Sequence, residues 1–217
     1  MKKICIIYNS KISLFNKFLL NRIIKILRKE NHVETFGTER IGHATLLCKV
    51  HIKKFDIIVA AGGDGTINEV INGMDDKTSL GIIPLGTANI GAYEANINKN
   101  PSKVAQIILS GKIKKIHIQE VNNRKFFLMT GVGYDASVVE TVQSNLFLKK
   151  IFGKLFFFIV SIAKLIYFKK ETIKTTPALY TTSPQPTIMV DGRFYELCRS
   201  FGKDSLNPTL KLYFDFD

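Results

Sequence analysis

The chain has 217 residues, of which 46% are hydrophobic, and it carries a formal net charge of +13. This length and composition predict a globular protein with a substantial core, and they exclude a disordered chain. The excess of Lys and Arg indicates anionic partners. Because the sequence shows no recognition helix, zinc-ligand spacing or aromatic RNA-binding signature, we expect no nucleic-acid partner.

The first 118 residues alternate short apolar strands with helical segments, the pattern of a parallel sheet covered by helices. Strands are expected at 4–8, 33–36, 57–61 and 80–83, and helices at 14–29, 43–51, 66–72 and 101–111. The apolar run 4–8 follows two lysines, as in a signal peptide, but it is too short and ends at Asn9. We therefore predict a Rossmann-like α/β domain over residues 1–118, in which this run is the first core strand.

The cysteines indicate a reducing environment. They are far apart, odd in number and form no CxxC pair: Cys5, Cys48 and Cys198. This spacing argues against a disulfide framework or a zinc site and fits a cytoplasmic protein.

The pattern changes after Gly111. Segments 113–121 and 125–130 flank Asn122-Asn123-Arg124, which predicts a β-hairpin with no helix between its strands. A glycine turn at 131–135 and a long basic and apolar segment at 145–170 follow. We expect a domain boundary near Ile118 and an incomplete β-rich second domain over residues 119–217.

The stretch 155–163 is the most apolar of the chain and is flanked by lysines. A membrane-spanning helix needs about 20 apolar residues, and Lys154 and Lys164 interrupt this one too early, so we expect no transmembrane segment. Two alternatives remain open. The stretch is either an interfacial helix whose lysines face anionic headgroups, or an amphipathic helix packed on the second domain with a solvated lysine face.

The most informative motif is the turn Gly62-Gly63-Asp64-Gly65-Thr66, placed where a buried strand passes into a helix. Glycines let backbone N–H groups approach an anion, and the helix adds the positive end of its dipole. The Asp64 carboxylate would repel a bound phosphate unless a cation such as Mg²⁺ lies between them. The turn therefore indicates a metal–nucleotide site, and the alternative is a glycine-rich turn that only closes a Rossmann-like unit.

Three motifs in order, GGDGTINEV, GIIPLGTANIGAYE and MTGVGYDASVV, resemble the diacylglycerol kinase catalytic-domain family, in particular the bacterial lipid kinases. The resemblance implies an α/β nucleotide domain and a β-rich second domain, with the active site in the cleft between them. It implies ATP-dependent phosphorylation of a lipid hydroxyl with Mg²⁺, by a cytoplasmic protein at the inner membrane surface. The acceptor stays open among diacylglycerol, a sphingoid base, ceramide and polyprenol.

The resemblance also implies the site residues. Asp64 would be catalytic through Mg²⁺, and the pattern assigns no further metal ligand. Glu69 either supports the loop or is an ordinary early-helix acid, His43 is either a nucleotide neighbour or a surface histidine, and position 90 is Ile where many relatives carry Asp. The residues expected to contact ATP are Asn9, Thr38, Gly62, Gly63, Asp64, Gly65, Thr66, Ile67, Asn68 and Thr87.

The base that takes the acceptor's proton is, in bacterial relatives, a Glu in a late Asp-Gly-Glu motif that follows the residues matched here. Asp191-Gly192 is interpreted as a turn, because Arg193 follows it and cannot act as a base. We therefore expect a C-terminally truncated chain. Three hypotheses stand: a lipid kinase, a catalytically silent remnant that binds nucleotide or a membrane surface, and an NAD kinase, which shares the Gly-Gly-Asp-Gly-Thr turn.

Overall fold

The computed structural model describes residues 1–121, 124–128, 134–167 and 209–213. They belong to two compact units, one formed by 1–128 together with 200–217 and the other by 129–199. This division differs from the boundary near Ile118 that the pattern predicts, because the hairpin after that residue packs with the first unit.

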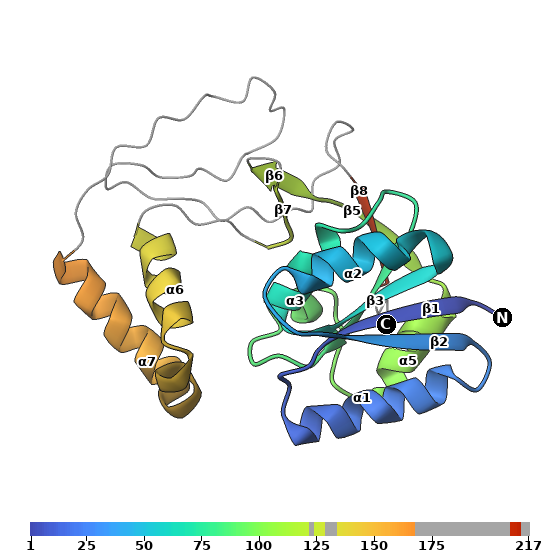
Figure 1. Ribbon diagram of the computed structural model, residues 1–217, viewed down its shortest axis with the longest axis horizontal. Coiled ribbons are helices and arrows are strands. Elements are labelled where there is room, and N and C mark those ends of the chain that lie inside the picture. Colours follow the sequence, from blue (N-terminus) through green and yellow to red (C-terminus); the bar gives the residue numbers. More distant parts are fainter. Residues whose placement is uncertain (122–123, 129–133, 168–208, 214–217) are drawn as a thin grey trace. The chain divides into compact units, whose positions relative to one another are not determined.

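The first unit is built on a sheet whose strands follow the order β2-β1-β3-β4-β8-β5 (Figure 1). Neighbouring strands from β2 to β8 run parallel, and β5 runs antiparallel to β8. In chain order the strands are β1 (Lys3–Asn9), β2 (His32–Thr38), β3 (Ile57–Gly62), β4 (Ser79–Pro84), β5 (Ile113–His117) and β8 (Thr209–Tyr213). Every residue of β3 and β4 is buried, as expected for parallel strands covered on both faces.

Helices cover both faces of this sheet. The helices α1 (Leu14–Leu27) and α5 (Pro101–Ser110) lie together on one face, and α2 (His43–His51) and α3 (Asp64–Ile71) lie together on the other (Figure 1). Two short helices, η1 (Ile52–Lys54) and α4 (Ile90–Glu94), complete the unit. The parallel α/β architecture predicted for the first part of the chain is therefore confirmed.

Local sequence signals explain where two of these helices begin and end. The Ser13 hydroxyl accepts a hydrogen bond from the Asn16 N–H and caps α1. The Asn100 side chain accepts from the N–H groups of Ser102 and Lys103, with Pro101 in the first turn of α5. That helix ends at Ser110 and is capped by Gly111, whose φ of 72° is left-handed and suits glycine.

The predicted strand 113–121 is split in two. β5 ends at His117 and joins the large sheet, whereas β6 (Gln119–Val121) pairs with β7 (Arg124–Phe126) in a separate two-stranded sheet. The predicted hairpin is thus confirmed for residues 119–121 and 124–126. The prediction of one continuous strand over residues 113–121 is wrong. The reason is non-local: β5 pairs along its whole length with β8, nearly a hundred residues away in the chain.

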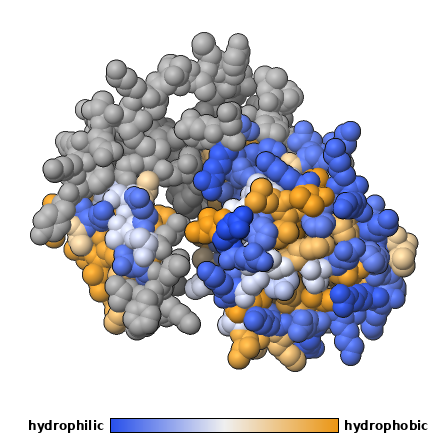
Figure 2. Space-filling model, viewed as in Figure 1, coloured by the Kyte–Doolittle hydropathy of each residue, from blue (hydrophilic) through white to orange (hydrophobic). Residues whose placement is uncertain are grey.

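The described part of the second unit consists of α6 (Tyr134–Ser144) and α7 (Leu146–Tyr167). The two helices pack through a small core of Val138, Val142 and Val160. Large apolar side chains remain exposed on α7, among them Phe158, Leu165 and Ile166 (Figure 2). Of the glycine turn expected at 131–135, residues 131–133 lie outside the described residues, and Tyr134 begins α6. The Asp191-Gly192 turn also lies outside them, as do residues 168–208 and 214–217 of the predicted β-rich region.

Among the described residues, no helix is long and apolar enough to cross a membrane. Cys5 and Cys48 are free thiols in the core. Burial raises the pKa of each thiol to about 12, so both stay protonated and unreactive at neutral pH.

Three aromatic side chains pack where the end of α2 meets the sheet. The rings of Phe36 and His51 stack with centroids 3.9 Å apart, and Phe55 meets both rings edge-on. Desolvation in this cluster lowers the pKa of His51, and the positive charge of Lys54 adds to the effect. The folded protein therefore favours the neutral imidazole.

This cluster predicts a pH dependence of stability. Because the pKa of His51 is lower in the folded state, the unfolded chain binds more protons, and stability falls as pH drops below the ordinary value of 6.5. Urea midpoints measured at pH 8 and pH 5 should show a smaller acid loss for His51→Phe than for the wild type. Equal losses in the two proteins would contradict the prediction.

Candidate functional site

The predicted site residues follow the carboxyl ends of four neighbouring strands. Asn9 ends β1 and Thr38 ends β2, and the two residues are register partners. Gly62 ends β3 and is the register partner of Pro84 at the end of β4, and Thr87 lies in the turn that follows. Because parallel strands end at the same edge, the four loops lie along one side of the sheet, where open α/β sheets bind ligands.

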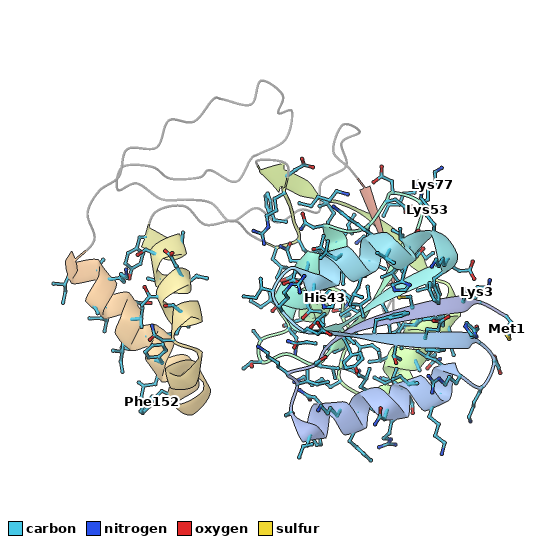
Figure 3. The ribbon with its side chains drawn as sticks, in the orientation of Figure 1. Met1, Lys3, His43, Lys53, Lys77 and Phe152 are labelled. Atoms are coloured by element: carbon cyan, nitrogen blue, oxygen red, sulfur yellow. The ribbon has the colours of Figure 1, made fainter. Side chains whose placement is uncertain are left out.

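The strand order reverses within this edge. From β1 the chain moves outward to β2, and it then crosses to β3 on the other side of β1. Such a switch point separates the loops after two adjacent strands and leaves room for a ligand. His43, at the start of α2, lies at this carboxyl edge, whereas Met1 and Lys3 lie at the opposite edge (Figure 3).

Two glycine turns contact each other directly at this edge. A Cβ on Gly86 would lie 2.4 Å from the Cα of Gly63, and a Cβ on Gly63 would lie 3.2 Å from the Cα of Gly86. The Leu85 N–H donates to the Gly62 carbonyl across the same contact, at 2.9 Å. The turn after β3 and the turn after β4 therefore pack backbone against backbone, which larger residues would prevent.

Asn89 closes the second glycine turn. Its side-chain oxygen accepts from the Gly86 N–H at 2.8 Å, and its side-chain nitrogen donates to the Gly86 carbonyl at 2.7 Å. The residue is 6% exposed and adopts a left-handed conformation with φ of 52°, which asparagine tolerates better than most residues. The turn is therefore held in shape by the protein's own contacts.

The helix after the first glycine turn begins at Asp64, two residues earlier than the pattern predicts. The N–H groups of Thr66 and Ile67 both donate to the Gly63 carbonyl. The first N–H groups of a helix lack intrahelical acceptors, and the helix dipole makes this end positive. Gly65 lies here and is exposed; apart from its chain neighbours and the backbone of its own helix, no atom of the described residues lies within 4 Å of the position its Cβ would take. An anion can therefore approach the backbone at this point.

Asp64 has a structural contact that the sequence does not reveal. One carboxylate oxygen accepts from the Gly91 N–H at 2.9 Å and the other from the Ile90 N–H at 3.2 Å. The side chain thus caps α4 and ties α3 to the segment after the second glycine turn. Ile90 contributes its backbone N–H to this contact.

The donor set allows one mode of magnesium binding. Within the described ranges, no group of three or more His, Cys, Asp or Glu side chains is placed to hold a metal ion. Mg²⁺ commonly binds through one or two carboxylates, waters and substrate phosphates. Each Asp64 oxygen retains a lone pair beyond its hydrogen bond, so this carboxylate fits such a role.

Glu69 supports the loop region rather than standing as an unattached early-helix acid. Its carboxylate accepts from the Ala44 N–H at 3.2 Å, and its carbonyl accepts from the Thr45 hydroxyl at 2.7 Å. Both contacts hold the beginning of α2. His43 accepts from the Glu39 N–H through Nδ1 at 3.1 Å, which orders the turn that follows Thr38.

Several predicted nucleotide contacts point away from the glycine turn or close a loop. The Ile67 side chain is fully buried in the core, so its backbone alone faces the turn. The Asn68 side-chain oxygen accepts from the Phe127 N–H at 3.2 Å. The Asn9 side-chain oxygen accepts from the Lys11 N–H at 2.9 Å and shapes the loop after β1.

Asn16 is a site residue that sequence reasoning missed. Its side-chain nitrogen donates to the Leu85 carbonyl at 2.7 Å, so α1 is tied to the turn that follows β4. A polar residue in the first turn of a helix gives no local sign of this contact. The first turn of α1 is thereby connected with the second glycine turn.

Comparisons with known proteins agree with this geometry. A family model described as the diacylglycerol kinase catalytic domain matches residues 3–121, more than half of the chain. A diacylglycerol kinase of Staphylococcus aureus strain JH9 is 34% identical over 165 residues, which cover 73% of this chain and 51% of the relative. That of strain Newman matches equally well. The chain spans about half the length of the curated relatives it matches.

Solved structures give the same result. A putative diacylglycerol kinase from Bacillus anthracis str. Sterne is similar with a TM-score of 0.56 and 27% identity, covering 61% of this chain and 50% of that one. A further diacylglycerol kinase structure from the same strain has a TM-score of 0.54 and 25% identity, covering 69% and 54%.

A pair of glycine variants tests the contact between the two turns. Gly86→Ala should lower the free energy of unfolding by about 2 kcal/mol or more, because its Cβ has no room. Gly65→Ala should leave stability unchanged or raise it by up to about 1 kcal/mol, since alanine favours helix and the space is open. Urea unfolding measures both, and equal effects of the two changes would contradict the packing described.

Proposed function

Because the chain belongs to the diacylglycerol kinase catalytic-domain family, we propose that it binds Mg-ATP at the carboxyl edge of its sheet and transfers the γ-phosphoryl group to a lipid hydroxyl. The observation that carries this proposal is the open backbone at Gly65, in the first turn of α3 and directly after Gly62 and Gly63. Diacylglycerol is the acceptor proposed first, since it is the substrate named for the relatives.

Phosphoryl transfer depends on positioning and on charge neutralisation. In the proposed reaction the acceptor oxygen forms a bond to the γ-phosphorus as the bond to the β–γ bridging oxygen breaks, ADP leaves, and the acceptor's proton passes to a base. The backbone of the Gly62–Thr66 turn would hold phosphate oxygens, with Asn9, Thr38 and Thr87 around them. Asp64 would hold Mg²⁺, which neutralises phosphate charge. No residue among those described is assigned as the base.

The acceptor would be reached at a membrane surface, and α7 supports this. Its sequence contains four lysines and no acidic residue. Phe158, Leu165 and Ile166 are 63%, 70% and 71% exposed. A helix with exposed apolar side chains and only positive charges is suited to lie in the interface of an anionic bilayer. Of the two alternatives for this stretch, we therefore propose the interfacial one.

Nucleotide binding tests the site directly. Calorimetry should detect binding of Mg²⁺ with a non-hydrolysable ATP analogue to the wild type. Gly65→Ala should weaken it about tenfold or more without loss of stability, because the added methyl group occupies space needed by a phosphate. Asp64→Asn keeps one oxygen acceptor for α4 and removes the charge, so it should weaken the magnesium-dependent part of the affinity. A wild type that binds no nucleotide contradicts the proposal.

Product assays separate the three hypotheses. Transfer of labelled phosphate from ATP to diacylglycerol in vesicles supports the lipid kinase. Nucleotide binding without transfer to any lipid supports the silent alternative, and formation of NADP from NAD supports an NAD kinase. Each assay uses the full chain and Asp64→Ala as the inactive reference.

Vesicle sedimentation tests the role of α7. The wild type should bind vesicles that contain anionic phosphatidylglycerol and should be released by salt, since the attraction is partly electrostatic. Phe158→Ser combined with Leu165→Ser should weaken binding several-fold by removing exposed apolar area. The matched control is Leu46→Ser on α2, which is 50% exposed and lies in the other unit. An equal loss in the control would contradict the assignment.

A further inference from the structure

β7 is held to α3 by side-chain amides. The Lys125 N–H donates to the side-chain oxygen of Asn72 at 2.9 Å, and the side-chain nitrogen of Asn72 donates to the Lys125 carbonyl at 2.8 Å. This reciprocal pair is what a residue of a neighbouring strand would supply. On the side away from β6, the asparagine therefore takes the place of a strand.

A second asparagine extends the same contact by one helical turn. The side-chain oxygen of Asn68 accepts from the Phe127 N–H at 3.2 Å. Asn72 also donates to the Asn68 carbonyl at 2.8 Å, and Lys125 Nζ donates to the Met74 carbonyl at 3.1 Å beyond the end of α3. Lys125 thus pairs with Asn72, and Phe127 pairs with Asn68. The two pairs match because residues two apart in an extended segment, and residues four apart in a helix, face the same way.

The Phe127 ring makes a third connection. The side chain is 7% exposed, and a Cβ on Gly91 would lie 2.3 Å from its ring. The ring therefore lies directly on α4, whose first turn is capped by Asp64. Residues 125–127 thus contact both helices that begin after the two glycine turns.

We infer that Asn68 and Asn72 are positioning residues that transmit nucleotide occupancy of the Gly62–Thr66 turn to β7. The inference rests on the proposed function, since it needs a nucleotide at that turn. A phosphate at the start of α3 stabilises its first turn through the backbone N–H groups and the helix dipole. Asn68 lies one turn further along the same short helix, so the change reaches β7 through direct hydrogen bonds.

β7 lies close in sequence to the point where the chain passes from the first unit to the second. Leu128 is the last residue of the first unit before the chain passes into the second unit at Met129. A change in the stability of residues 125–127 on nucleotide binding would therefore affect the segment that leads into the second unit. The two asparagines connect phosphate binding with this segment without touching the phosphate through their side chains.

Amide hydrogen exchange measured by NMR tests the inference on the full chain. Saturating Mg²⁺ with a non-hydrolysable ATP analogue should slow exchange at Lys125 and Phe127 by about threefold or more in the wild type. In Asn72→Ala the nucleotide-dependent slowing at Lys125 should disappear, while the affinity measured by calorimetry stays within about threefold. A merely structural role would raise exchange at these amides equally with and without nucleotide.

Conservative variants sharpen the test. Asn68→Asp keeps the oxygen that accepts from Phe127 and should retain the response at that amide, whereas Asn68→Ala should lose it. Asn72→Asp keeps an acceptor for the Lys125 N–H and should likewise retain the response at that amide, although it loses the donor to the Lys125 carbonyl. Asn21→Ala, an exposed position on α1, is the matched control. If Asn72→Ala does not fold, the two Asn68 variants decide the matter.

The outcomes are distinguishable. Nucleotide binding without slowing at Lys125 and Phe127 in the wild type overturns the coupling and leaves the proposed function standing. A response that persists in both alanine variants overturns it as well. Absence of nucleotide binding overturns the proposed function together with the coupling.

Discussion

The arrangement of the site depends on the direct backbone contact between Gly63 and Gly86. This contact brings the turns after β3 and β4 closer than any side chain would allow. The contact sets where α3 and α4 begin, and Asp64 can therefore reach the first N–H groups of α4. Asn16 reaches Leu85 within the same group of loops. These glycines therefore have two roles. They allow two backbone segments to pack against each other, and they leave space for a ligand.

Helix α3 shows how a polar face can organise a fold. Its side chains at 64, 68 and 69, with Asn72 at its end, satisfy backbone groups of neighbouring segments: α4, Phe127 directly after β7, α2, and Lys125 in β7. Buried backbone groups that lose water need such partners. These side chains replace water where loops and short helices meet. The same helix presents its first turn to the proposed nucleotide, so binding and support share one element.

Much of this could be predicted from local pattern. The strands that end at Asn9, Thr38, Gly62 and Pro84 are short apolar runs, and parallel strands place their ends at one edge, so the location of the candidate site follows from the sequence. The partners of Asp64 and Asn68 could not be predicted, because they are backbone groups brought near by tertiary packing. The division of 113–121 into β5 and β6 was missed for the same reason, since β8 comes from far along the chain.

The position of β8 between β4 and β5 has a consequence for how the protein is made. Residues 129–199 are, in topological terms, an insertion between strands of one sheet. During synthesis the ribosome delivers β5 long before β8, so β5 has no neighbour in the large sheet until residues 209–213 emerge. Pairing over so many residues carries a loop-closure cost and slows folding. Completion of the sheet is therefore expected to be a late event in the life of the nascent chain.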